Sequence, residues 1–292
     1  MTRPGFLAIT VVGCVLGIAT ATTAGRAIEP TIALATVLLA LVAHAALNVL
    51  NDYHDALNGA DAANTNGVFP FTGGARLIQD GEVSTAATRR LAISLLVLVV
   101  PGGLLLAAHS GWGLVLVGMA GLLIGWMYSA PPLALMSRGL GEAAVAAAWA
   151  LVVVGADYAQ RGEFSRVAAF AGIGYGLLIG NILLINGFPD AAADGQVGKR
   201  TLVVRIGSAP AALVYLGVAL ASHAWLVAGV ASGFAPSTVL LGLASLPFSL
   251  AAAHALIRHS NLPSELRPAI VGTILAALVN GLGIAAGFAL AA

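Results

Sequence analysis

Charge is scarce in this sequence. Only 9% of its 292 residues are charged, whereas 59% are hydrophobic and the mean hydropathy is +0.97. A soluble domain carries about 25% charged residues, so these few charges could not cover the surface of a water-soluble fold of this length. The net charge of +1 also provides no basic field that would bind nucleic acid. The composition is that of a protein embedded in lipid.

Cysteine, lysine and acidic residues are scarce as well. The single cysteine, Cys14, excludes a disulfide within the chain and lies in an apolar run, where a small core or lipid-facing residue is expected. The single lysine, Lys199, stands shortly after an acidic segment. Five of the twelve acidic residues fall in two short segments, so most of the chain is nearly free of negative charge. These five are Asp52, Asp55, Asp61, Asp190 and Asp194.

Long apolar runs fill much of the chain. A run of about 18 or more apolar residues can cross the hydrocarbon core as a helix, whereas a β-barrel would alternate apolar and polar residues. The sequence therefore predicts an all-α, polytopic membrane protein with nine transmembrane helices, in one transmembrane domain over residues 1–292. We interpret the first run as a retained span rather than a signal peptide, because the remainder is also membrane-embedded. The nine spans are expected at 5–24, 32–51, 89–108, 111–129, 139–157, 166–187, 209–231, 236–257 and 268–290.

Basic residues are distributed unevenly about these spans. With nine spans, the N-terminus shares one side of the membrane with the loops after the second, fourth, sixth and eighth spans. That side holds ten basic residues and the other holds three, a bias that marks the cytoplasmic side. The two long polar loops, at about 52–88 and 188–208, should therefore face the cytoplasm. The three basic residues on the opposite side are Arg26, Arg161 and Arg166.

The first acidic motif follows the second span and includes Asn48, Asn51, Asp52 and Asp55, with Asp61 shortly beyond. If this stretch is helical, Asn48, Asp52 and Asp55 lie on one face, and so do Asn51 and Asp55. Carboxylates clustered at a membrane boundary repel one another and lose hydration, and a divalent cation would relieve both costs. Such oxygen ligands suit Mg²⁺, which commonly binds a few carboxylates together with phosphate oxygens.

The second acidic motif stands at the end of the sixth span. Asp190 and Asp194 are one helical turn apart, and Lys199 and Arg200 follow closely in the run Gly-Lys-Arg-Thr. Arg76 takes a similar place after the first motif, in the run Thr-Gly-Gly-Ala-Arg. Guanidinium and ammonium groups hold phosphates. Two acidic clusters with basic neighbours therefore predict two Mg²⁺ ions across a diphosphate, whose departure from carbon they would assist.

Other interpretations of these motifs exist. An acidic helix end with a basic loop is ordinarily a solvated cap with salt bridges, and either motif alone supports that reading equally well. Two such motifs on the same predicted side, each after a long apolar span, favour the diphosphate site. An ion-coupled transporter is the alternative from another class, since intramembrane acids also mark ion pathways. Transporters, however, place their sites near the bilayer midplane, whereas these acids lie at predicted helix ends beside basic loops.

The two motifs resemble those of the UbiA superfamily of intramembrane prenyltransferases. Asn51, Asp52 and Asp55 match the start of that family's Asn-Asp-x-x-Asp-x-x-x-Asp motif, but Gly59 stands where its last Asp is expected. The MenA-like branch, the 1,4-dihydroxy-2-naphthoate prenyltransferases, has Gly at that position and Asp two residues on. Gly59 and Asp61 fit this variant, so the chain is most similar to the MenA-like branch.

Further segments support the resemblance. Residues 70–76 and 190–207 are similar to the MenA-like branch, and residues 128–142 to the family's loop between spans four and five. The resemblance implies nine helices around a central cavity that opens to the cytoplasm and sideways to lipid, in the cytoplasmic membrane of a bacterium or archaeon. It implies an Mg²⁺-dependent enzyme that moves a polyprenyl group from its diphosphate to an aromatic acceptor, most closely 1,4-dihydroxy-2-naphthoate in menaquinone biosynthesis. Other acceptors, such as 4-hydroxybenzoate and homogentisate, and terpene cyclisation stay open, as do the tail length and the oligomeric state.

The resemblance also implies roles for individual residues. Those expected to bind Mg²⁺ are Asn51, Asp52, Asp55, Asp61, Asp190 and Asp194. Those expected to carry the catalysis are Asp55, Asp190, Asp194 and Lys199. The expected substrate-binding residues are Arg76, Arg138, Arg200, Asn48, Tyr53, Tyr128 and Tyr158. Of these, Tyr158 follows span five on the side opposite the motifs, where an interfacial tyrosine beside a solvated Asp157 is the competing interpretation.

Overall fold

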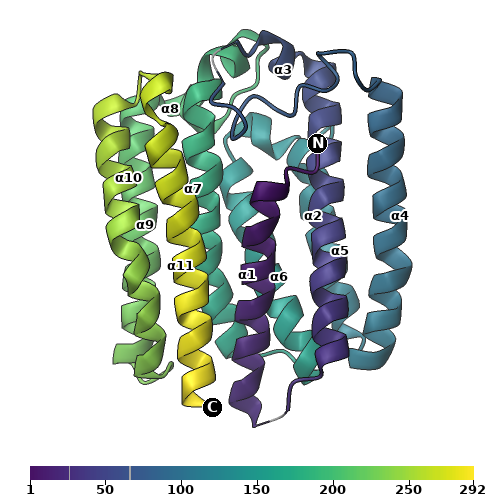
Figure 1. Ribbon diagram of the computed structural model, residues 1–292, viewed down its shortest axis with the longest axis vertical. Helices are drawn as coiled ribbons and strands as arrows, with labels where there is room; N and C mark the ends of the chain where they lie inside the picture. Colours follow the sequence, from purple (N-terminus) through teal and green to yellow (C-terminus); the bar gives the residue numbers. More distant parts are fainter. Residues whose placement is uncertain (26, 66) are drawn as a thin grey trace.

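The computed structural model describes residues 1–25, 27–65 and 67–292, so Arg26 of the charge distribution lies outside the described residues. Within these residues the chain is helical and contains no strand. Figure 1 shows the long helices side by side as a bundle, with α3 at the end nearer the N-terminus and the C-terminus at the opposite end. The predicted all-α architecture is confirmed.

Nine long apolar segments cross the bundle in the described part of the chain. Eight are long and apolar enough to span a membrane, and the ninth, α5, has 17 residues. The predicted number of spans is confirmed. The nine segments are α1 (Pro4–Ala21), α2 (Pro30–Asn58), α4 (Thr85–Ser110), α5 (Gly113–Ser129), α6 (Gly141–Arg161), α7 (Arg166–Gln196), α9 (Ser208–Ala231), η3 (Ser237–Ser245) continued by α10 (Leu246–His259), and α11 (Arg267–Ala291). The shorter helices are η1 (Thr22–Ala24), α3 (Ala60–Ala63), η2 (Leu135–Arg138), α8 (Leu202–Ile206) and η4 (Pro263–Glu265).

Local signals in the sequence explain where several helices begin. Pro4 and Pro30 open α1 and α2, where a missing backbone N–H leaves no helical hydrogen bond unmade. The hydroxyl oxygen of Ser84 accepts a 3.2 Å hydrogen bond from the backbone N–H of Ala87 at the start of α4. Ser165 caps α7 in the same way. These four starts fall within a few residues of the predicted ones.

The predicted ends of the second and sixth spans are wrong. The apolar runs predict ends at residues 51 and 187, but α2 continues to Asn58 and α7 to Gln196. The polar ends of these two helices are buried in the protein, as the 5% exposure of Asp55 and the 4% exposure of Asp194 show. Helical hydrogen bonding therefore continues past the apolar run, and both acidic motifs are helical.

The two larger apolar clusters of the bundle lie to one side of it, and a small third cluster joins α2 and α4. One apolar cluster joins α1, α6, α7 and α11, and a second joins α7, α9, α10 and α11. Small residues allow this close approach, since a Cβ added at Gly17 of α1 or at Gly176 of α7 would collide with the backbone of α6. In the part of the chain that the structure describes, neither of the two larger clusters includes α2, α4 or α5. An apolar cavity lies between these three helices, α1, α6 and α7.

Candidate active site

The first acidic motif forms the last turns of α2. Asp52 and Asp55 are buried there, with exposed fractions of 3% and 5%. Oδ1 of Asp52 accepts a 2.7 Å hydrogen bond from Nη2 of Arg3. Oδ2 of Asp55 accepts a 3.1 Å hydrogen bond from Nδ2 of Asn51. The two carboxylates therefore have different partners, although both face the interior.

Gly59 turns the chain so that a third carboxylate joins the first motif. It ends α2 with φ at 82°, a left-handed conformation that glycine adopts without strain. The short helix α3 follows at once and carries Asp61, which is 6% exposed. Asp61 lies against the backbone of Gly74, where an added Cβ would be only 2.6 Å from its Cγ. The Gly59 and Asp61 pattern thus supplies an acid from the next helix instead of from α2.

The second acidic motif forms the end of α7, and the connection after α2 reaches across to it. Nδ2 of Asn64 donates a 2.6 Å hydrogen bond to Oδ1 of Asp190, and the backbone N–H of Gly73 donates to Oδ2 at 3.4 Å. We call this connection, residues 59–65 and 67–74, the strap. Through these contacts the strap fixes the end of α7 beside the end of α2.

Lys199 connects the two motifs through its ammonium group. Its Nζ lies 3.0 Å from Oδ1 of Asp55 and 3.5 Å from Oδ1 of Asp194. Burial by itself would lower the pKa of Lys199, but the carboxylates of Asp55 and Asp194 outweigh burial and raise that pKa above its usual range. The structure thus brings the single lysine into contact with both acidic motifs, with its charge retained.

These side chains enclose a polar pocket of about 80 Å³. Five carboxylates line it, those of Asp55, Asp61, Glu142, Asp190 and Asp194, together with the ammonium group of Lys199 and the guanidinium group of Arg3. Burial, with the carboxylates of Asp55 and Asp52 nearby, raises the pKa of Asp61 to about 7. Side-chain cations therefore balance the negative charge of this pocket incompletely.

The donor set of the polar pocket fits the predicted Mg²⁺. Carboxylate and amide oxygens are the hard ligands that Mg²⁺ prefers, and Oδ1 of Asn186 is a buried oxygen at this pocket that accepts no hydrogen bond from any described residue. Among the described residues, no three His, Cys, Asp or Glu side chains are grouped closely enough to hold a metal ion as they stand. Lys199 lies between Asp55 and Asp194, in the space that a shared ion would need.

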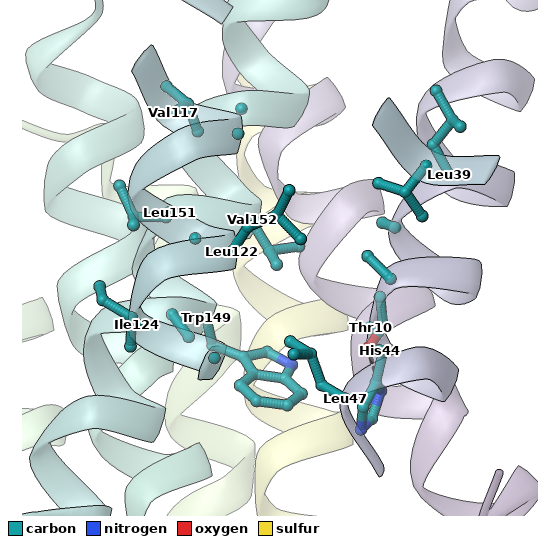
Figure 2. A pocket seen from close by; sticks show the side chains of 18 of the residues that line it. Thr10, Leu39, His44, Leu47, Val117, Leu122, Ile124, Trp149, Leu151 and Val152 are labelled. Atoms are coloured by element: carbon teal, nitrogen blue, oxygen red, sulfur yellow. Dashed lines mark hydrogen bonds between the residues drawn. The ribbon is translucent and has the colours of Figure 1, made fainter. Parts of the chain in front are cut away.

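An apolar cavity of about 420 Å³ adjoins the polar pocket. The cavity extends along α2 from Asn51 to Thr36, which the rise of a helix converts to about 22 Å. Figure 2 shows the aliphatic side chains of α2, α5 and α6 around it. Such a deep apolar space suits a long hydrocarbon chain. The residues that line both spaces are Arg3, Asn51, Tyr128, Leu183 and Asn186.

The apolar cavity opens toward lipid between α4 and α5. Val100 and Leu104 of α4 line it and are 49% and 45% exposed. Met119 of α5 lines it and is 56% exposed. Apolar side chains that belong to both the cavity wall and the outer surface of a membrane-spanning bundle mark an opening to hydrocarbon. This agrees with the expected sideways opening.

The predicted substrate-binding residues divide into two groups. Asn48 and Tyr128 line the apolar cavity as expected. Arg76 instead supports the strap, because its Nη1 donates a 3.0 Å hydrogen bond to the backbone oxygen of Asn64. The substrate-binding roles of all the predicted residues stay predictions. The predicted residues that line neither space are Arg76, Arg138, Arg200, Tyr53 and Tyr158, and Asp52 of the predicted metal ligands also lines neither.

Tyr158 lies near the far end of α6. Its hydroxyl accepts a 3.1 Å hydrogen bond from the backbone N–H of Gly113, which ties α6 to the start of α5. The neighbouring Asp157 is not solvated, as one interpretation of the sequence holds. It is 1% exposed, it accepts from Thr20 at 2.8 Å, and it pairs with Arg161 at 3.2 Å. These contacts join α1, α5 and α6 and close the bundle at this end, which is remote from the acidic motifs.

Three residues of the site were not predicted from the sequence: Arg3, Asn64 and Asn186. Asn186 stands four residues before Asp190, so helical spacing could have selected it. Arg3 and Asn64 reach the site only through contacts with Asp52 and Asp190, which are far from them in the sequence. No local pattern could have identified those two residues.

The chain is similar to known membrane enzymes over most of its length. A model of the UbiA prenyltransferase family matches residues 10–270. A 1,4-dihydroxy-2-naphthoate octaprenyltransferase from Mycobacterium tuberculosis is 32% identical over 260 residues, which are 86% of this chain and 84% of that protein. The Escherichia coli protein of the same name is 26% identical over 288 residues, which are 96% of this chain and 91% of that one.

Solved structures agree with this fold. A UbiA homologue from Archaeoglobus fulgidus bound to GPP and Mg²⁺ has a TM-score of 0.61 at 14% identity, covering 97% of this chain and 98% of its own. An apo UbiA homologue from Aeropyrum pernix has a TM-score of 0.64 at 17% identity, covering 94% of this chain and 96% of its own. With the family model matching nearly the whole chain, these findings establish that the protein belongs to the UbiA prenyltransferase family.

Proposed function

We propose that this protein transfers a polyprenyl group from polyprenyl diphosphate to 1,4-dihydroxy-2-naphthoate, in an Mg²⁺-dependent step of menaquinone biosynthesis. The observation that carries the proposal is that a polar and an apolar space adjoin. Carboxylates of both acidic motifs line a polar pocket, and that pocket shares five lining residues with an apolar cavity that extends about 22 Å along α2. A molecule with a diphosphate head and a hydrocarbon tail matches this arrangement, because its charged end fits the polar pocket and its tail fits the apolar cavity.

The polar pocket would hold the diphosphate with its metal ions. Asp55, Asp61, Asp190 and Asp194 would bind Mg²⁺, which supplies Lewis-acid stabilisation of the leaving diphosphate when bound. The Archaeoglobus fulgidus homologue in complex with GPP and Mg²⁺ supports this use of the fold. Asn51 and Asn186 offer amide oxygens at the boundary between the two spaces.

Two cationic side chains would act on the same diphosphate. Lys199 contacts Asp55 and Asp194, and it would move its ammonium group to the phosphate oxygens when metal ions bind the carboxylates. Arg3 pairs with Asp52 and lines both spaces, so its guanidinium group lies where the diphosphate would meet the prenyl carbon. Asp52 would then orient Arg3 and would not bind metal.

The apolar cavity would hold the tail and protect the reaction. Its aliphatic walls exclude water from the carbon that loses the diphosphate, so the acceptor ring and not water attacks that carbon. The opening between α4 and α5 would let a long tail extend into the bilayer. The identity of the acceptor is supported by relatives in five bacteria that carry the name 1,4-dihydroxy-2-naphthoate octaprenyltransferase.

A transfer assay with purified protein in lipid nanodiscs tests the proposal. The donor is geranylgeranyl diphosphate, and the acceptors are 1,4-dihydroxy-2-naphthoate, 4-hydroxybenzoate and homogentisate, each with Mg²⁺ or with EDTA. Mass spectrometry identifies the products. We expect prenylation of the naphthoate with loss of CO₂, only in Mg²⁺. Prenylation of another acceptor in its place would refute the acceptor, and release of diphosphate without any prenylated acceptor would favour a terpene cyclase.

A further inference from the structure

Three polar side chains meet midway along the apolar cavity. Thr10 of α1, His44 of α2 and Trp149 of α6 all line it, and we call them the mid-cavity cluster. Oγ1 of Thr10 and Nδ1 of His44 share a hydrogen bond of 2.7 Å. The rings of His44 and Trp149 meet edge to face, with centroids 4.9 Å apart. Figure 2 shows the three side chains among aliphatic neighbours.

The mid-cavity cluster has unused hydrogen-bonding groups. Nε1 of Trp149 is buried and makes no hydrogen bond to any described residue. The Thr10 hydroxyl fixes the His44 ring through Nδ1, and Nε2 of that ring has no hydrogen-bond partner within the described part of the chain. A buried polar group without a partner is destabilising, and Nε1 of Trp149 is such a group. A deeper cavity residue, Thr36, behaves differently, because its hydroxyl donates to the backbone oxygen of Ile32 and is satisfied.

A prenyl tail could not satisfy these groups, since it has no donor or acceptor. Aliphatic side chains would serve the tail better at the same positions. An aromatic acceptor, in contrast, has a flat ring and hydroxyl or carboxyl oxygens. An oxygen of that kind can accept from the Trp149 N–H and exchange a hydrogen bond with His44, while the two rings pack against the acceptor's ring.

The depth of the mid-cavity cluster is suitable for such an acceptor. His44 stands seven residues before Asn51 on α2, and Trp149 stands seven residues after Glu142 on α6. Asn51 and Glu142 both line the polar pocket. The rise of a helix therefore places the cluster about 10 Å from the polar pocket along both helices. All oxygens of 1,4-dihydroxy-2-naphthoate lie on the ring that is prenylated. With the reacting ring carbon about 3 Å from the prenyl carbon and the far hydroxyl about 3 Å from the cluster, the width of that one ring is enough to connect the two.

We propose that the mid-cavity cluster is the part of the acceptor site that binds the oxygen substituent farthest from the prenylated carbon. His44 and Trp149 contact that oxygen, and Thr10 orients His44. The inference rests on the proposed function, because it takes an aromatic hydroxy acid as the second substrate. It adds residues that determine which acceptor binds, and it separates the acceptor contacts from the diphosphate contacts.

The test compares Trp149→Phe and His44→Phe with wild type in nanodiscs. Each change keeps a ring and removes the free nitrogen. We expect the KM for 1,4-dihydroxy-2-naphthoate to rise about tenfold, as the loss of one hydrogen bond predicts. The KM for geranylgeranyl diphosphate should change by less than about twofold. Thr10→Val should give a smaller rise of the acceptor KM, since it only releases the His44 ring.

Two matched controls show whether a substitution of this kind affects the KM only by disturbing the fold. Trp225→Phe removes an indole that donates to the backbone oxygen of Phe170, and Thr238→Val removes a hydroxyl that donates to the backbone oxygen of Gly287, both away from the cavity. Neither should change the acceptor KM. An unchanged acceptor KM in both Trp149→Phe and His44→Phe would overturn the proposal. So would a raised KM for the prenyl diphosphate alone, because the cluster would then line the path of the tail.

A binding measurement distinguishes failure of this inference from failure of the proposed function. Calorimetry under anaerobic conditions would follow 1,4-dihydroxy-2-naphthoate, which carries the far hydroxyl, binding to the protein without any prenyl diphosphate. If wild type transfers no prenyl group to the naphthoate yet binds this probe, and Trp149→Phe weakens binding about tenfold, the proposed reaction fails and the cluster remains an aromatic-acid site. If wild type does not bind the probe, or Trp149→Phe binds it equally well, the inference is wrong.

Discussion

At the scale of single residues, the ammonium group of Lys199 connects the two acidic motifs. We expect Lys199→Met to lower kcat/KM for prenyl transfer about 100-fold, because Asp55 and Asp194 lose their shared counter-charge and the diphosphate loses a cationic contact. Steady-state transfer in nanodiscs measures this. Arg258→Met is the control, since Arg258 is an exposed residue of α10 outside both spaces. Equal activities of the two variants would show that Lys199 has no part in the reaction.

Gly74 gives a second test at this scale. Alanine there is strained by a φ of 72° and would also press on the carboxylate of Asp61. Gly81 has a similar φ of 76°, but a Cβ there would meet nothing within 4 Å. Both changes should cost about 1 kcal/mol of stability from backbone strain. Only Gly74→Ala should lower prenyl transfer, by about tenfold or more, as Asp61 is displaced. Similar activities in the two variants would contradict a role for the position of Asp61.

Because charged residues are scarce in this sequence, some residues of the site could be predicted from it, whereas others could not. Asp55, Asp190, Asp194 and Lys199 could be selected because charges are rare in this chain and these four cluster. The sequence could not distinguish Asp52 from Asp55, because the difference lies in Arg3, a partner 49 residues away from Asp52. Contacts of that kind depend on how the helices pack.

At the scale of elements, the number of spans follows from hydropathy but the ends of α2 and α7 do not. Apolar periodicity stops where the motifs begin, whereas these helices continue because their polar ends are buried by contacts with the strap and with Lys199. The eighth span also begins as the 3₁₀-helix η3, which hydropathy does not distinguish from an α-helix. Packing against α11 accounts for that segment, since a Cβ at Gly283 would lie 2.7 Å from the backbone of Leu241.

Replacing Gly283 therefore tests how η3 is held. Gly283→Ala must push η3 away from α11, and overpacking of this kind costs about 1–3 kcal/mol. We expect the apparent melting temperature in detergent to fall by roughly 5 °C. Gly217→Ala on the exposed face of α9 is the matched control, because an added Cβ there meets nothing within 4 Å. A melting temperature for Gly283→Ala at or above that of Gly217→Ala would mean that η3 is free to move.

At the scale of the whole molecule, the acidic motifs lie at one end of the bundle and the closure around Asp157 lies at the other. The excess of basic residues at the motif end predicts that this end faces the cytoplasm. The cavity between these ends was implied by the resemblance to the UbiA superfamily but not by composition or spacing. Its walls come from α1, α2, α4, α5, α6 and α7, so it exists only once the helices have packed.

The orientation can be measured with single cysteines. Cys14 is buried, so a membrane-impermeant maleimide should not label the wild-type protein. We expect Glu163→Cys, in the exposed turn between α6 and α7, to react in intact cells. Gly81→Cys, in the exposed connection between α2 and α4, should react only in inside-out vesicles. The reverse pattern would place the motif end outside the cytoplasm.

The joint action of both acidic motifs on one diphosphate is best tested by Mg²⁺-dependent prenyl transfer with Asp55→Asn and Asp190→Asn. Each substitution keeps the side-chain shape and removes one carboxylate charge from the polar pocket. Glu82→Gln removes an exposed carboxylate near the strap and serves as the control. We expect each Asp variant to lose at least about 100-fold in kcat/KM, with Glu82→Gln unchanged. Wild-type activity in either Asp variant, or wild-type activity that persists in EDTA, would show that the two motifs do not form a shared metal and diphosphate site.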